Sequence, residues 1–166
     1  MAEGRSSAAD RCLARRRHAD HRDPLLLEEL PAPRDGLSGT ERRMLRAIAA
    51  GAATPMAAFR AAQDLEAAPF LGDVWFFRAL TDLGGGADRL VETQAGWPLP
   101  AAPPLGDAQA FTRVSLRLTR AGERVLGQEA DRVTLLGVDR WVGGTHVTPG
   151  TAWRWDPTAQ RLLQPA

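Results

Sequence analysis

Residues 137–156 carry the sequence GVDRWVGGTHVTPGTAWRWD, and the rest of the chain is organised around this stretch. It contains three of the five tryptophans, the only histidine beyond the N-terminal region, and paired glycines between apolar residues. We interpret the tryptophans as packing anchors and Gly143-Gly144 as a β-bulge, because glycine inside a strand is typical of a bulge. The stretch therefore predicts a compact β unit that closes the domain.

The neighbouring sequence extends this β unit. Short strands are predicted at residues 133–138, 141–147, 152–155 and 161–163. Pro149-Gly150 and Asp156-Pro157 supply turn signals between them. Together these segments predict a small antiparallel β meander at the C-terminal end.

Three helices are predicted upstream. Ser38 followed three residues later by Glu41 is the sequence of a capping box, so the first helix begins there, and Gly51 is a candidate cap at its end. Thr54-Pro55 begins the second helix, because proline is tolerated where the amide has no helical partner. Asp73 is expected to cap the third helix, which ends at three glycines, residues 84–86.

A hairpin and a fourth helix follow. Residues 90–93 and 114–118 predict two strands, and the proline-rich insert between them is unsuited to a central strand. Thr119 is expected to cap the helix that comes next. The order helix, helix, helix, strand, strand, helix predicts an α+β, winged-helix-like fold built on a helix-turn-helix core and closed by the meander.

Domain organisation follows from composition. Residues 1–23 are polar and charged, which is typical of a mobile segment, and residues 24–166 are expected to form one domain. Cys12, His18 and His21 lack the paired spacing of a zinc site, so we expect no metal or other cofactor.

The charge balance bears on the class of partner. The chain of 166 residues has 21 basic residues, all arginine, and 20 acidic residues, for a net charge of +1. This balance argues against a generic polyanion binder. The sequence lacks an apolar run of membrane-spanning or signal-peptide length, so we expect a cytoplasmic protein without a membrane partner.

Five segments together resemble the C-terminal half of a bacterial family known only as a domain of unknown function. They are GLSGTERRMLRAIAAG, APFLGDVWFFRAL, LTRAGERVLGQEAD, GVDRWVGGTHV and WRWD, spread from about Leu30 to Leu163. Members of that family carry a longer N-terminal domain, so the resemblance implies a chain shortened at its beginning. It implies no catalytic residue and no activity.

Three functions follow from these features. We favour a non-enzymatic interaction or regulatory module that binds a protein partner or a second copy, because apolar residues and prolines are expected on the third helix and the hairpin insert. The alternative is a winged-helix protein that binds nucleic acid, with phosphate contacts from Arg42, Arg43 and Arg46 on the outer face of the first helix.

The third hypothesis is a small-ligand binder or hydrolase built on the C-terminal β unit. His146 would act as a general base oriented by Asp139 or Asp156, and Arg140 or Arg154 would hold an anion. Arg154 has a competing structural role, as the partner of one of those two aspartates. We therefore predict no catalytic residue, and a binding surface that includes Asp139, Arg140, His146 and Arg154.

Overall fold

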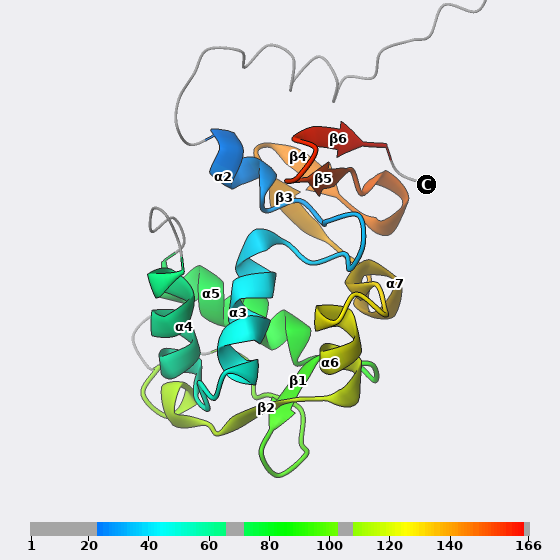
Figure 1. Cartoon of the computed structure of the whole chain (residues 1–166). Helices are drawn as coiled ribbons and strands as arrows, with labels where there is room; N and C mark the ends of the chain where they lie inside the picture. Colours follow the sequence, from blue (N-terminus) through cyan, green and yellow to red (C-terminus); the bar gives the residue numbers. More distant parts are fainter. Residues whose placement is uncertain (1–22, 66–71, 103–107, 165–166) are drawn as a thin grey trace, which may run out of the picture.

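The computed structural model of the chain describes residues 23–65, 72–102 and 108–164. Within these ranges the protein is an α+β structure with six α-helices and three antiparallel hairpins. Helices α3 to α6 and the first hairpin form the lower body in Figure 1, and the other two hairpins lie above it beside α2 (Asp23–Leu27). Apart from Asp23, the predicted mobile segment 1–23 lies outside the described residues.

The first two predicted helices are confirmed, together with their N-terminal caps, while the C-cap of the first is Ala50 and Gly51 follows it with φ of 101°. They are α3 (Gly39–Ala49) and α4 (Pro55–Asp64). The Ser38 hydroxyl accepts a hydrogen bond from the Glu41 amide, and the Glu41 carboxylate accepts one from the Ser38 amide, so the capping box is complete. Thr54 caps α4 by accepting from the amide of Ala57.

The third predicted helix is α5 (Asp73–Leu83), and its cap differs from the prediction. Gly72 is the N-cap residue and makes no side-chain cap, while the Asp73 carboxylate accepts from the adjacent amide of Val74. Of its three consecutive aromatic residues, two are buried in a cluster of phenylalanines, but Trp75 is 63% exposed.

The hairpin and fourth helix are confirmed. Strands β1 (Val91–Thr93) and β2 (Leu116–Leu118) pair antiparallel, and the 3-10 turn η1 (Phe111–Arg113) precedes β2. Thr119 caps α6 (Arg120–Leu126) by accepting from the amide of Gly122. The Thr119 amide in turn donates to the carbonyl of Leu90, which ties α6 to the hairpin.

The strand predicted at residues 133–138 is wrong, because this segment forms helix α7 (Arg132–Leu136). The Asp131 side chain caps the helix by accepting from the Thr134 amide, and Gly137, with φ of 70°, ends it. A short apolar run is compatible with either a strand or a helix, and here the cap decides for the helix.

The strand predicted at residues 141–147 is also wrong, because two strands occupy this region. Strands β3 (Arg140–Val142) and β4 (Thr145–Val147) are joined by Gly143 and Gly144, whose φ values are 57° and 80°. Positive φ at both central residues is required by the tight turn that matches the twist of a hairpin, so the glycines form a turn and not a bulge.

The C-terminal β structure consists of two separate hairpins and not of one meander. After the 3-10 turn η2 (Pro149–Thr151), β5 (Arg154–Asp156) pairs only with β6 (Arg161–Leu163) within the described residues. The turn predicted at Asp156-Pro157 is confirmed, since the Asp156 carboxylate accepts from the amides of Thr158 and Ala159.

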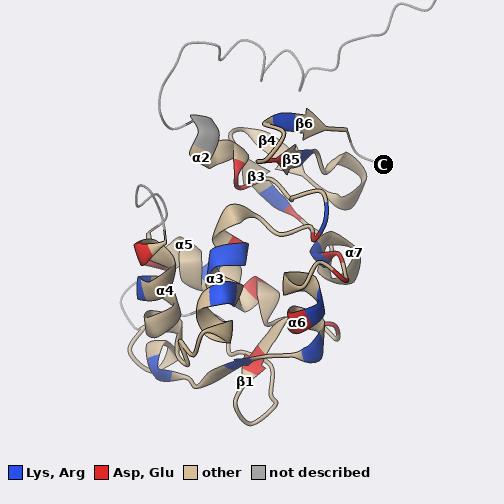
Figure 2. Cartoon of the chain, in the orientation of Figure 1, with Lys and Arg blue, Asp and Glu red and all other residues tan. Residues whose placement is uncertain are grey.

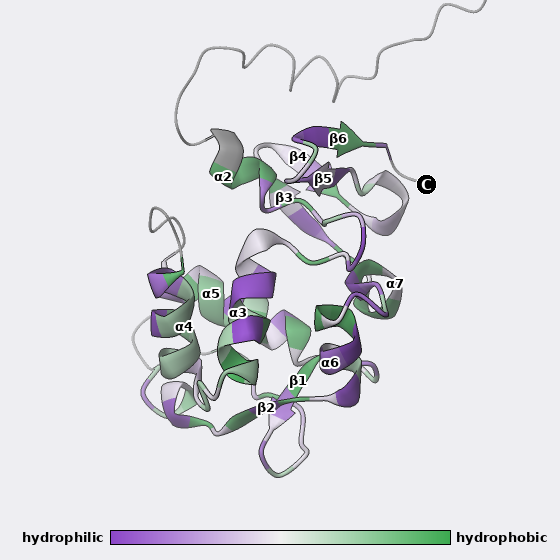
Figure 3. Cartoon of the chain, in the orientation of Figure 1, coloured by the Kyte–Doolittle hydropathy of each residue, from purple (hydrophilic) through white to green (hydrophobic). Residues whose placement is uncertain are grey.

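The described residues form two apolar cores. The larger core lies among α3, α4, α5, the first hairpin and α6, and the smaller core lies under the C-terminal hairpins and includes Leu30, Val142 and Val147. In Figure 3 the hydrophobic positions of the helical body appear in green along parts of α3, α4, α5 and α6. None of the helices in the described ranges is long and apolar enough to cross a membrane.

Candidate functional site

The outward face of hairpin β3–β4 carries an exposed group of three side chains. Trp141 lies directly opposite His146 in the register of the two strands, and their rings stack with centroids 4.9 Å apart and an angle of 9° between the planes. The Nε2 atom of His146 lies 2.6 Å from a carboxylate oxygen of Asp139. Because strand residues alternate between faces, Val142 and Val147 point the other way into the smaller core.

The structure corrects the predicted role of Trp141. Its side chain is 71% exposed, so it is not a packing anchor. Trp155 does pack, against the smaller core, and is partly buried. The difference arises because the glycine turn sets the register that directs Trp141 outward.

Arg140, which was predicted on the binding surface, points inward instead. Its Nη1 atom lies 3.2 Å from Oε1 of Glu41, a carboxylate that is 1% exposed. Nη2 of Arg132 lies 3.1 Å from the same oxygen, and the other oxygen accepts from the Ser38 amide. One carboxylate therefore joins helix α3 to α7 and β3.

The electrostatics of Glu41 follow from these partners. Burial alone would raise the pKa of the Glu41 carboxyl, but the guanidinium groups of Arg140 and Arg132 and the Ser38 amide outweigh it and lower the pKa. The Glu41 carboxyl is therefore ionised in the folded protein, and an ionised carboxylate can link the two arginines.

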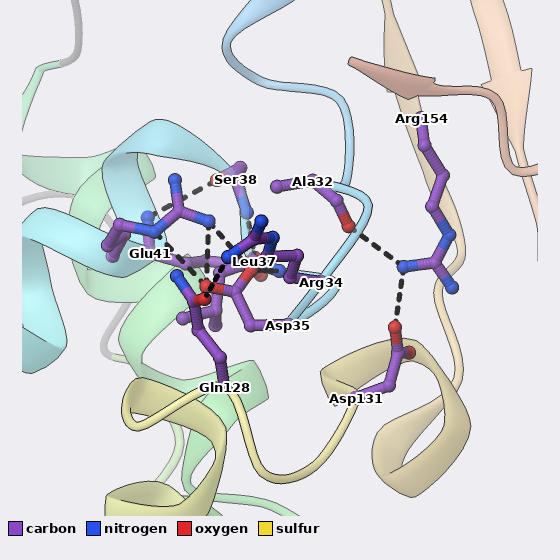
Figure 4. A network of polar contacts seen from close by, with 10 residues as sticks. Ala32, Arg34, Asp35, Leu37, Ser38, Glu41, Gln128, Asp131 and Arg154 are labelled. Atoms are coloured by element: carbon purple, nitrogen blue, oxygen red, sulfur yellow. Dashed lines mark hydrogen bonds and ion pairs between the residues drawn. The ribbon is translucent and has the colours of Figure 1, made fainter. Parts of the chain in front are cut away.

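Arg154 is likewise part of an ion pair inside the molecule. Its Nη1 atom donates to a carboxylate oxygen of Asp131 at 2.6 Å and to the carbonyl of Ala32 at 2.9 Å (Figure 4). The sequence prediction named Asp139 or Asp156 as its partner, and that prediction is wrong. Burial raises the pKa of Asp131, but the bond from Arg154 and the Thr134 amide lower it further than burial raises it.

The four predicted surface residues are therefore separated into two sets. Asp139 and His146 lie together on the exposed face, whereas Arg140 and Arg154 are about three-quarters buried in different ion pairs. Sequence reasoning missed the carboxylates that hold the two arginines. Glu41 was recognised only as a cap, and Asp131 was overlooked because the segment after it was interpreted as a strand.

The predicted phosphate contacts on α3 differ in their availability. Arg42 makes three contacts with the buried carboxylate of Asp35, the shortest at 2.6 Å, and Arg43 lies 3.2 Å from a carboxylate oxygen of Glu28. Arg46 is exposed and has no ion pair or side-chain hydrogen bond to another residue in the described part of the chain. Figure 2 shows basic positions, in blue, on the part of the α3 ribbon that faces the viewer.

The unfolding free energy should depend on pH through Glu41. Because the folded-state pKa is lowered, its contribution is complete above the unfolded-state pKa of about 4.3 and is lost as the pH falls through the folded-state value. We expect stability to decline below about pH 5, and the decline to be shallower in Glu41→Gln. Urea unfolding at a series of pH values measures both slopes.

Comparison of the parent chain with Glu41→Gln separates the contribution of Glu41 from that of other carboxyl groups, whose effect on stability has the opposite dependence on pH. Burial raises the pKa of Glu29 and of Asp82, so these two groups favour the folded state more as the pH falls. Identical slopes for the parent chain and Glu41→Gln would contradict the role assigned to Glu41.

Comparison with known proteins adds no further constraint on the site. The chain matches no protein-family model, no curated protein and no solved structure. The three residues that the sequence offered as metal ligands, Cys12, His18 and His21, all lie outside the described residues. Within the described ranges, groups of three or more histidine, cysteine or acidic residues that could hold a metal ion are absent.

Proposed function

We propose that the chain is a non-enzymatic interaction or regulatory module that binds a protein partner on the outer face of hairpin β3–β4. We define the docking face as Asp139, Trp141 and His146. The observation that carries the proposal is the exposure of Trp141, at 71% for one of the largest apolar side chains. Tryptophan is enriched at protein interfaces and among the few residues that supply most of the binding energy.

The docking face is already ordered. Trp141 stacks on His146, and His146 is held by Asp139 at 2.6 Å. Fixing a side chain on binding costs about 0.5–1.5 kcal/mol, and part of that cost is removed when the ring is held beforehand.

The chemistry of the docking face favours a cationic group on the partner. Asp139 places an exposed carboxylate beside the aromatic pair, with its side chain 83% exposed. A guanidinium or ammonium group attracted by this carboxylate could also lie over the open face of Trp141. We therefore expect a partner segment that presents arginine or lysine next to an apolar residue.

We further infer a winged-helix-like arrangement for the helical body and a cytoplasmic location. The order α3, α4, α5, β1, β2, α6 supports the first. Nucleic-acid binding has less support, because α5 would be the helix in the groove and it exposes Trp75 together with the acidic residue Asp73.

Replacement of the docking face should leave the fold intact. We expect Trp141→Ala and His146→Ala each to change the free energy of unfolding by less than about 1 kcal/mol, because neither ring is buried. A tryptophan in a core would instead cost about 3–5 kcal/mol. Urea denaturation followed by circular dichroism measures the difference.

A matched control for binding is available elsewhere on the surface. Trp97, in the loop after β1, is also 71% exposed. We expect Trp141→Ala to lose association that Trp97→Ala retains. Sedimentation equilibrium tests a second copy as the partner, and quantitative comparison of captured proteins between the two variants tests other proteins.

Two results would contradict the proposal. One is equal association by Trp141→Ala and the parent chain in both measurements. The other is a monomer that retards duplex DNA with a steep dependence on salt, since that dependence is the signature of phosphate neutralisation.

A further inference from the structure

A groove lies away from the docking face, between α3 and the turn that joins β5 to β6. We propose that it binds a small organic oxyanion, either a carboxylate or a phosphate group. The groove has a volume of about 510 Å³, within the range of about 300–1,000 Å³ that is typical of small-molecule sites. A second hollow of about 160 Å³ shares Ala32, Arg42, Arg46 and Pro157 with it.

Three regions that are distant in sequence form the walls. The first region is the loop before α3 with α3 itself, which contributes Arg34, Arg42 and Arg46. The turn after α6 contributes Gln128, and the end of strand β5 contributes Asp156. Convergence of these segments makes the groove a product of the tertiary fold. Figure 4 shows Arg34, Asp35 and Gln128 close together.

Arg42 is held in a fixed orientation in this wall. Asp35, which is 1% exposed, accepts from its Nε atom at 3.2 Å and from its Nη2 atom at 2.6 and 2.8 Å. These contacts leave Nη1 of Arg42 outside the ion pair. A guanidinium group held by a buried carboxylate is a preorganised donor, although part of its charge is neutralised.

Arg34 and Arg46 supply the charge that is not neutralised. Arg46 follows Arg42 by one helical turn and has no ion pair or side-chain hydrogen bond within the described ranges. Among the described residues, the side chain of Arg34 makes only a 3.4 Å hydrogen bond, to Oε1 of Gln128. The one lining carboxylate, that of Asp156, accepts from two amides of its own turn, so it is stabilised without a cation.

The groove therefore has a net positive charge and donors on more than one wall. An oxyanion between Arg34 and Arg46 would accept charge-assisted hydrogen bonds from both guanidinium groups, and planar guanidinium groups suit carboxylate and phosphate equally. The size of the groove limits the ligand to a small molecule or to the end of a side chain.

Titration of the full chain with inorganic phosphate and, separately, with succinate tests the proposal at constant ionic strength. Amide chemical shifts in two-dimensional NMR report the site and the dissociation constant. We expect Arg46→Gln and Arg34→Gln each to weaken binding roughly tenfold, as expected for loss of a hydrogen bond from a charged group. Arg60→Gln is the matched control, because Arg60 is an exposed arginine on α4 outside the groove.

Each outcome has a definite meaning. Binding of inorganic phosphate alone assigns the site to a phosphate group, binding of succinate alone assigns it to a carboxylate, and binding of both supports a shared oxyanion site. Absence of shifts with either probe overturns the proposal, as does an equal loss of affinity in Arg60→Gln, which would indicate unspecific ionic attraction. Two groove variants are used, so that a folding defect in one does not remove the test.

Discussion

Glu41→Gln is expected to lower the free energy of unfolding by about 3–5 kcal/mol, the range found when one partner of a buried ion pair is removed. The carboxylate is 1% exposed and is the shared partner of Arg132 and Arg140. Glutamine has nearly the same shape and can still accept from the Ser38 amide. The loss therefore reports the charge and not the cap or a cavity.

The arginines explain why the expected loss is large. Arg132 is 6% exposed, and its Nε atom, like Nε and Nη2 of Arg140, is buried without a hydrogen-bond partner in the described part of the chain. Without the Glu41 charge, two guanidinium groups would stay largely buried without a carboxylate to offset their loss of hydration.

Urea denaturation at neutral pH measures the loss, and Glu129→Gln provides the control. Glu129 is exposed and lies in the turn after α6, so its replacement should change stability by no more than about 0.5 kcal/mol. A loss below about 1 kcal/mol in Glu41→Gln would show that the ion pairs contribute little to the packing of α3 against α7 and β3.

Gly122→Ala is expected to destabilise the protein by about 3 kcal/mol, the upper part of the usual range for overpacking. Gly122 lies in helix α6, where alanine normally improves stability by about 1 kcal/mol over glycine. Here a Cβ atom would lie 2.1 Å from the carbonyl oxygen of Leu90. The obstacle is backbone, so relief requires α6 to move away from the hairpin.

The sign of the effect is the decisive part of this second prediction. Gly150→Ala is the control, because Gly150 is exposed and a Cβ atom there would meet nothing within 4 Å. We expect thermal and urea midpoints to fall in Gly122→Ala and to stay near the parent values in Gly150→Ala. A more stable Gly122→Ala protein would mean that α6 does not pack closely on the strand.

Local signals in the sequence were sufficient for much of the helical body. The capping box at Ser38, the Thr54-Pro55 start and the Thr119 cap each predicted a helix that the structure contains. These predictions succeed because a cap satisfies backbone groups within one turn, so all of the interacting atoms lie within a few residues.

The C-terminal region was predicted less well because two local signals were given the wrong weight. Two glycines between apolar runs are typical of a hairpin turn, and interpreting them as a bulge placed Trp141 in the core. Asp131 before an apolar run is an N-cap signal, and overlooking it turned α7 into a strand. Both errors concern information that the sequence contains.

The partners of the arginines were decided only by the tertiary structure. Nothing local connects Glu41 with Arg140, which is 99 residues away, or Arg34 with Gln128, which is 94 residues away. The sequence alone determined where α3, α4 and α6 begin and where the first hairpin lies. Which guanidinium groups are neutralised and which remain available depends on distances between segments, because electrostatic pairing acts through space and not along the chain.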